Sequence, residues 1–371
     1  MAIADDEGVL KAIASPGRSV ARAGARLASI DGLRAIAVLT VLVFHAHQHG
    51  AVPDETFPVN LGARGVDLFF VISGFCLARP YLVTAARERS FCIDWGAFMI
   101  RRLARIAPPY YAALLLFAVL VLGPMHVPSD VSLATRDAIA KELPLDALFL
   151  TSPAPLINSS FWTLGVEMRW YLLCPLLVAL VVRAPAIFAL VGVGLAIAYG
   201  RAPYLAADFG ILPCFMLGIV AAAIGLTRYA SRAATVAQIA ALPLLAAAIA
   251  HVARQPIVDH ADTLWQLAAF AVVVAADAAW LRRILAIAPL AFVGRASYGI
   301  YLVHEPLAVW SGDHGWSWPI GVAIALAGGI AFYAFVERRL VARPVRSAIE
   351  ATLASVGFGR WPLIFHVERA S

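Results

Sequence analysis

The sequence predicts an all-α fold, a polytopic membrane helix bundle, and two observations carry this prediction. Of the 371 residues, 62% are hydrophobic and only 14% are charged, and the mean hydropathy is +0.82. A typical soluble domain is closer to half apolar and a quarter charged. The apolar residues also come in blocks of about 20, the length that a helix needs to cross a hydrocarbon core of about 30 Å. Buried helices of a soluble protein would need more polar surface than this composition supplies.

About ten such blocks follow one another, and each predicts a transmembrane helix. The fifth block is short and rich in glycine, and no internal repeat is visible. We expect one membrane domain at 30–340, between a polar N-terminal tail at 1–29 and a short C-terminal tail at 341–371. The tail at 1–29 lacks the layout of a cleavable signal peptide. The blocks lie at 30–48, 65–83, 103–123, 161–182, 185–200, 208–226, 235–252, 263–281, 292–311 and 317–337.

The arginines beside these blocks predict the orientation of the chain. If all the blocks span the membrane, every dense arginine cluster falls on one side and the opposite segments are mildly acidic. Because basic residues accumulate in cytoplasmic loops, we expect both termini to be cytoplasmic. The net charge of +6 therefore indicates membrane lipids, and not nucleic acid, as a partner. Abundant alanine and arginine, with only Lys11 and Lys141, indicate a bacterial protein. Together with the predicted spans, this leads us to expect a multi-pass protein of the bacterial cytoplasmic membrane.

Several ionisable residues lie inside the predicted spans, where they are costly and are functional candidates by default. Two of them also have a structural interpretation: Asp277 as a buried, hydrogen-bonded carboxyl group, and Arg169 as a partner for a group on another helix. Most of the remaining residues lie at one of two heights within the membrane, and this indicates that they belong to a common functional site. The full set is Arg34, His45, Asp67, Arg105, Glu167, Arg169, Asp277 and His304.

The first span presents a guanidinium group and an imidazole on one face. Arg34 and His45 are eleven residues apart, and three helical turns take about 10.8 residues, so the two side chains lie about 16 Å apart along the axis. Asp67 and Glu167 enter from the other side and reach nearly the height of His45. This arrangement predicts a long ligand with an anionic head near the cytoplasm, because guanidinium groups bind phosphate by paired hydrogen bonds. Coenzyme A, with phosphates at one end and a thioester at the other, fits that description.

Five motifs, in order along the chain, resemble those of the acyltransferase-3 family of integral-membrane O-acyltransferases. The resemblance covers about Ser29–Leu340, with two mild departures: Thr163 stands where the family usually has Ser, and Trp170 where it has Phe. Residues 341–371 are too few for the hydrolase-like domain that some relatives append, so we expect a stand-alone membrane domain. The motifs are SIDGLRAIAVLTVLVFH (29–45), GARGVDLFFVISGF (62–75), FMIRRLARIAPPYY (98–111), FWTLGVEMRWYLLCPLL (161–177) and VGRASYGIYLVHEPL (293–307).

The resemblance implies an enzyme that moves an acyl group, acetyl by default, from acyl-coenzyme A to a hydroxyl of a sugar-containing acceptor. The acceptor would be a cell-surface glycan, a lipid-linked saccharide or a glycosylated natural product. Acyl-coenzyme A, expected to be acetyl-CoA, would be the donor substrate, and no permanently bound cofactor is expected. The functional residues that carry over from the family are Arg34, His45, Arg102, Arg105 and Glu167.

We interpret these residues as parts of one mechanism. Arg34, Arg102 and Arg105 would hold the donor phosphates, and His45 would take the proton of the attacking hydroxyl, because imidazole titrates near neutrality. Glu167 or Asp67 would orient the ring of His45. An acyl-imidazole intermediate is a second route that the sequence leaves open. Further residues expected to line the pocket are Ser73, Trp162, Ser297, Tyr298, Tyr301 and His304.

The same residues are open to two other interpretations, a metal site and a transporter. His45 and His49 share a helix face while His47 points away, so a zinc site is conceivable, but no HExxH motif surrounds them and we predict no metal. Intramembrane charges also suit a transporter or flippase of an anionic solute or lipid, although the half-repeats of many transporters are missing. The acyl group, the acceptor and its side of the membrane, and the oligomeric state stay open at this point.

Overall fold

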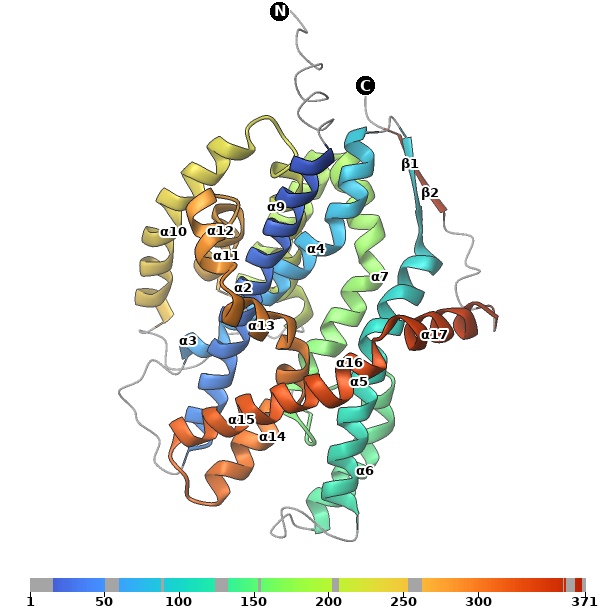
Figure 1. Ribbon diagram of the computed structural model, residues 1–371, viewed down its shortest axis with the longest axis vertical. Coiled ribbons are helices and arrows are strands. Elements are labelled where there is room, and N and C mark those ends of the chain that lie inside the picture. The colour runs from blue at the N-terminus through green and yellow to red at the C-terminus, as the bar shows by residue number, and fades with distance from the viewer. Residues whose placement is uncertain are drawn as a thin grey trace, which may run out of the picture.

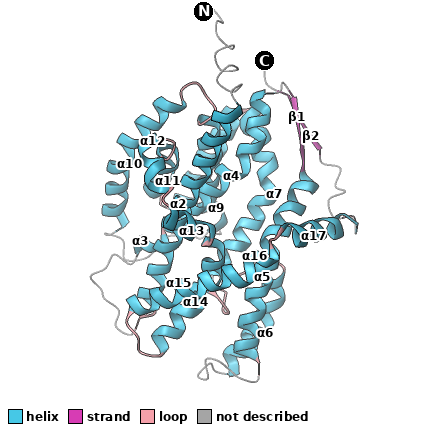
Figure 2. Cartoon of the chain, in the orientation of Figure 1, coloured by secondary structure: helices cyan, strands magenta, loops and turns pink. Residues whose placement is uncertain are grey.

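The computed structural model describes residues 16–50, 60–87, 90–123, 133–152, 155–201, 207–252, 262–355, 357 and 364–368, nearly all of them helical (Figures 1 and 2). The α-helices are α2 (Pro16–Gln48), α3 (Asn60–Ala63), α4 (Gly65–Arg87), α5 (Trp95–Leu122), α6 (Leu133–Ala147), α7 (Trp162–Arg183), α8 (Pro185–Arg201), α9 (Ala207–Ile224), α10 (Ala230–Val252), α11 (Thr263–Ala275), α12 (Ala279–Leu285), α13 (Ala288–Arg295), α14 (Ser297–Asp313), α15 (Trp318–Phe332), α16 (Arg338–Leu340) and α17 (Arg343–Ser355). A 3₁₀ turn, η1 (Ser159–Phe161), precedes α7, and a π-helical turn, η2 (Tyr333–Glu337), follows α15.

Six of the described helices are long and apolar enough to cross a membrane: Ala28–Gln48, Leu61–Arg87, Trp95–Leu122, Ser159–Arg183, Ala230–His251 and Trp318–Leu340. The number rises to seven if the bent pair α11 and α12 counts as one span. The helical, multi-pass membrane architecture is therefore confirmed. The count of about ten spans stays a prediction, because its other members are helices of fewer than 18 apolar residues, such as Pro185–Ala198 and Gly210–Ile224.

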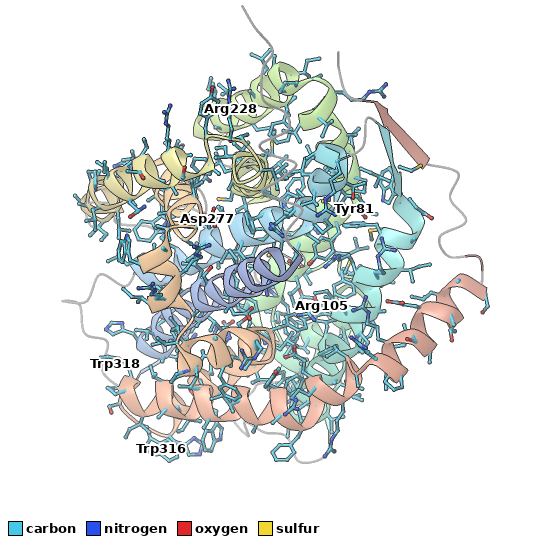
Figure 3. The ribbon with its side chains drawn as sticks, turned by 45° about the horizontal axis from the view of Figure 1, so that its top comes forward. Tyr81, Arg105, Arg228, Asp277, Trp316 and Trp318 are labelled. Atoms are coloured by element: carbon cyan, nitrogen blue, oxygen red, sulfur yellow. The ribbon has the colours of Figure 1, made fainter. Side chains whose placement is uncertain are left out.

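The predicted span at 263–281 is not straight. Helices α11 and α12 meet at an angle of 100°, with Asp277 in the short break between them. The carboxylate of Asp277 lies 3.7 Å from the guanidinium group of Arg282. This is the kind of structural role that the sequence suggested for Asp277, which is labelled in Figure 3.

Within the described residues, one element departs from the predicted all-α fold. Strands β1 (Ser90–Asp94) and β2 (Ile364–Glu368) pair antiparallel, with Ser90 opposite Glu368 and Asp94 opposite Ile364. Asp94 then begins α5, because its side chain accepts a hydrogen bond of 2.9 Å from the amide of Ala97, one of the donors that a helix leaves unpaired at its start. The strands therefore tie the C-terminal segment to the start of α5.

Helix α2, which runs in blue along the molecule in Figure 1, packs against several other helices. Helices α4, α12, α13, α14 and α15 all contact it. Helices α4 and α9 approach each other through glycines: a Cβ at Gly74 would collide with the carbonyl of Phe215, and one at Gly218 with the carbonyl of Val71. Small residues allow such backbone contact in membrane proteins, where the lipid offers no hydrophobic drive for association. This packing fixes α4, and Ser73 with it.

Candidate active site

A cavity of about 400 Å³ lies between α2, α4, α5, α7, α14 and the segment η2–α16. Helices α2, α4, α5, α7 and α14 contribute side chains from the motifs that the sequence singled out. Figure 3 labels one of them, Arg105 of α5, near the centre of the molecule. The predicted site residues that line the cavity are Arg34, Ser73, Arg102, Arg105, Glu167, Ser297, Tyr298 and Tyr301.

The cavity is rich in guanidinium groups. Besides Arg34, Arg102 and Arg105, two arginines that the sequence did not assign to the site, Arg295 and Arg338, line it. Arg34 lies 3.5 Å from the carboxylate of Asp31, and the guanidinium carbon of Arg102 lies 5.5 Å from the ring centroid of Phe98. Such a concentration of fixed positive charge around one cavity suits a ligand with several phosphate charges.

Glu167 lies in the wall of the cavity and is held by two hydrogen bonds. The hydroxyl of Ser73 donates to Oε1 over 3.0 Å, and the hydroxyl of Tyr171 donates to the same oxygen over 2.6 Å. Ser73 comes from α4, whereas Tyr171 lies one turn after Glu167 on α7. The carboxylate is therefore fixed between two helices, in reach of a ligand in the cavity.

A hydroxyl cluster closes the cavity near the start of α7. The hydroxyls of Thr163 and Tyr301 are 2.7 Å apart, and Tyr301 also donates to the carbonyl of Ser160 over 3.2 Å. Tyr298, on the same helix as Tyr301, donates to the carbonyl of Ile106 over 2.8 Å. Two tyrosines of the late motif thus fasten α14 to α5 and to the start of α7.

His45 lies beyond this end of the cavity and does not line it. The ring of His304 connects the two regions: its centroid is 5.3 Å from that of Tyr301 and 5.1 Å from that of His45. Nδ1 of His304 is 2.7 Å from the carbonyl of Tyr301. Because a carbonyl only accepts, this nitrogen carries the proton and the neutral ring keeps its lone pair on Nε2.

The acidic partner of His45 is Glu305. Nδ1 of His45 lies 3.8 Å from Oε1 of Glu305, and both side chains are largely buried. Glu305 is fixed in turn by the start of α7: Oε1 accepts from the hydroxyl of Ser159, and Oε2 accepts from the amide and the hydroxyl of Ser160 over 2.6 and 2.5 Å. A buried carboxylate needs such donors, because burial without them would be costly.

A comparison with known families decides what this arrangement belongs to. The model of one family, described as an acyltransferase domain, matches residues 27–336. The chain belongs to the acyltransferase-3 family. It is therefore an acyltransferase, and the family resemblance noted in the sequence is confirmed.

The acyltransferase also resembles curated bacterial proteins. It is 28% identical to the peptidoglycan O-acetyltransferase OatA of Listeria monocytogenes over 317 residues, which make up 75% of this chain and 49% of that protein. It is 30% identical to the O-acetyltransferase OatA of Staphylococcus aureus over 166 residues, 41% of this chain and 24% of that protein. The chain thus spans about half or less of the curated relatives it matches. No solved structure matches the acyltransferase.

Besides His45, three predicted residues of the acyltransferase lie apart from the cavity. Asp67 is buried beside Arg64, with 3.6 Å between carboxylate and guanidinium, and accepts from the thiol of Cys214. Trp162 is partly buried against the apolar core, and His304 lies behind Tyr301. Among the described residues, the acidic side chain beside His45 is therefore that of Glu305, whereas Asp67 pairs with Arg64 and Glu167 with Ser73 and Tyr171. The roles assigned to these residues stay predictions.

Glu305 is the site residue that the sequence reasoning missed. A usable signal was present, because Glu305 is an acidic residue inside a predicted span and immediately follows His304 in the late motif. The family motif pointed to its neighbour His304, and Glu305 itself was assigned no role. The same carboxylate also completes a group with His45 and His49, in which one ligand atom from each residue lies within 4.8 Å of the others.

Proposed function

We propose that this acyltransferase transfers an acetyl group from acetyl-coenzyme A to a hydroxyl of a sugar-containing acceptor in the bacterial cytoplasmic membrane. The observation that carries the proposal is the arginine-lined cavity that ends beside His304 and His45. The names of the Listeria and Staphylococcus proteins both support an O-acetyl transfer, and that of the Listeria protein, a peptidoglycan O-acetyltransferase, supports a glycan acceptor.

The donor would bind with its phosphates among the guanidinium groups of Arg34, Arg102 and Arg105. Arg105 is exposed and also lines the cavity, so it lies where the cavity opens. Arg295 and Arg338 extend the same positive surface. In the proposed topology, with about ten spans and both termini cytoplasmic, this opening faces the cytoplasm, where acetyl-CoA is available. The thioester would reach the other end of the cavity, near Tyr301 and Thr163.

His45 would act as general base. Its imidazole takes the proton from the acceptor hydroxyl while that oxygen attacks the thioester carbonyl. The carbon–sulfur bond then breaks, and the departing thiolate of coenzyme A takes up the proton from the imidazolium. Glu305, 3.8 Å from Nδ1, stabilises the positive charge on the ring in between. An acetyl group carried on His45 itself is the competing route, and exchange of acetyl groups between two coenzyme A pools without acceptor would reveal it.

The test is acetyl transfer by membranes that contain the protein or its His45→Ala variant. With radiolabelled acetyl-CoA, label should appear in a saccharide fraction for the native protein and fall to background for the variant, with membrane insertion confirmed for both. His314→Ala is the matched control, because His314 is an exposed histidine beyond the end of α14. Full transfer by His45→Ala would overturn the assignment of the base. Uptake of the label without any transfer would favour the transporter or flippase alternative.

A further inference from the structure

We propose that His45, His49 and Glu305 form a binding site for a divalent metal ion such as Zn²⁺, and that an ion bound there inhibits acyl transfer. The three ligand atoms lie within 4.8 Å of one another. His49 directly follows α2, and its amide donates to the carbonyl of His45 over 3.0 Å, so the helical turn continues through it. The two imidazole rings are nearly parallel, 8° apart in orientation, with centroids separated by 6.3 Å.

The spacing of the groups suits a metal better than a direct hydrogen bond. Nδ1 of His45 and Oε1 of Glu305 are 3.8 Å apart, which is too long for a hydrogen bond. Two ligands of a tetrahedral zinc ion, each about 2.0–2.2 Å from the metal, are separated by roughly 3.3–3.6 Å. Small side-chain rotations therefore bring the three groups onto one ion. Among the described residues, Nδ1 of His45 is buried without a hydrogen-bond partner, so the protein leaves this nitrogen available.

The chemistry of the ligand set also favours zinc. Two imidazoles and one carboxylate are the protein ligands of several zinc enzymes, with a fourth position left for water. The carboxylate of Glu305 is already held in place by hydrogen bonds, because Ser159 and Ser160 donate to its two oxygens. Hydrogen bonds of this kind to a ligating group typically contribute to metal affinity. The third ligand comes from α14, far along the chain, and is the group that the histidine pattern of α2 lacked.

An ion can reach this site from the end of the molecule where α2 finishes. Gln48 is exposed and His49 is half-buried. Trp318, whose ring lies 6.0 Å from that of His47, is at the periphery of the molecule in Figure 3. An ion on Nδ1 of His45 would leave the neutral ring protonated at Nε2, so neither nitrogen could take the proton of the acceptor and transfer would stop. This inhibition rests on the proposed function, whereas the binding of the metal does not.

Binding is measured first, by calorimetric titration of ZnCl₂ into the chelator-treated, detergent-purified full chain. We expect one ion per chain, and Co²⁺ in place of Zn²⁺ should give the visible absorption of a tetrahedral site. His49→Ala should lower the affinity for the metal at least about tenfold. Even the loss of a residue that only hydrogen-bonds to a metal ligand typically lowers the affinity by about that factor. His314→Ala, which removes a histidine outside the site, should bind as the native chain does. Unchanged affinity in His49→Ala, or no binding to the native chain, would overturn the site.

Activity is measured second. Zn²⁺ should inhibit acetyl transfer by the native chain, and EDTA should restore it. The His49→Ala variant, which keeps His45 and Glu305, should retain its metal-free activity and resist Zn²⁺. Equal inhibition of both proteins would overturn the inhibitory role. If the metal binds as expected but no acetyl transfer occurs in its absence, the proposed function fails and the metal site stands.

Discussion

Replacing Gly329 by alanine should loosen the contact between α15 and α14 on which the late motif depends. Gly329 is buried on α15 against Ile300 of α14. A Cβ at this position would lie 2.6 Å from Cα of Ile300 and 2.8 Å from its Cγ1. Ordinary Cβ contacts start at 3.4 Å, so the two helices must separate by about 0.8 Å, the difference between 3.4 and 2.6 Å. Ile300 is followed directly by Tyr301, which lines the cavity.

The neighbouring residue supplies a matched control. A Cβ at Gly328 would meet only the end of the Leu307 side chain, which can rotate away, and not the backbone. Both substitutions gain the same helix propensity, about 1 kcal/mol for alanine over glycine. Only Gly329→Ala overpacks a backbone contact, which typically costs about 1–3 kcal/mol. The two variants should therefore differ in the free energy of unfolding by about 1–3 kcal/mol, with Gly329→Ala the less stable.

The assay is thermal unfolding of both variants in the same detergent, followed by acetyl transfer at a temperature where both are folded. Gly329→Ala should unfold several degrees below Gly328→Ala. It should also transfer more slowly, because α14 carries His304 and Glu305 to His45. Equal unfolding temperatures would refute the reasoning, since they would mean that the α14–α15 contact relaxes without cost.

Three further outcomes follow from the site and from the segment before α7. Glu305→Gln should lower kcat for acetyl transfer by about 100-fold with an unchanged KM for acetyl-CoA, because the amide cannot stabilise the imidazolium of His45, and native-like kcat would contradict this role. Arg102→Lys should raise the KM for acetyl-CoA about tenfold with little change in kcat, because lysine lacks the paired donors that hold phosphate; a fall in kcat alone would speak against donor binding. Burial, and then the charge of Glu142, raise the pKa of Asp146 to about 7. Its folded pKa lies above the unfolded one, so the stability linked to its proton is present below about pH 4 and is lost as pH rises through about 7. Asp146→Asn should flatten this decline in unfolding temperature, and an identical pH slope would count against it.

Hydropathy predicted the helical segments because membrane crossing constrains length and composition together. It did not predict the bend between α11 and α12, or the short ribbon of β1 and β2. The apolar composition of a segment indicates how many of its residues can lie in lipid. It does not indicate whether the helix stays straight or bends within that segment. Asp277 lies in the break and pairs with Arg282 of the next helix, and the ribbon pairs two segments far apart in the chain.

The site shows the same division between local and long-range information. The motifs on α2, α4, α5, α7 and α14 led to eight residues that line one cavity. This succeeded because the spacing within a motif determines which of its residues share one face of their helix. Helical spacing also placed Arg34 and His45 on a common face, yet Arg34 lies at the cavity and His45 contacts α14. A position along one helix tells which face a side chain takes. It does not tell which neighbouring helix covers that face, and the partner of His45 is set by that packing.

Glu305 connects the two parts of the site. Its carboxylate accepts hydrogen bonds from the hydroxyl of Ser159 and the amide of Ser160 in η1, the turn that leads into α7. The same group lies 3.8 Å from Nδ1 of His45. Helix α7 carries Thr163 and Glu167 into the cavity. The segment that enters α7 therefore holds the carboxylate beside His45, and the helix itself carries two side chains into the donor cavity, so one element connects both parts of the site.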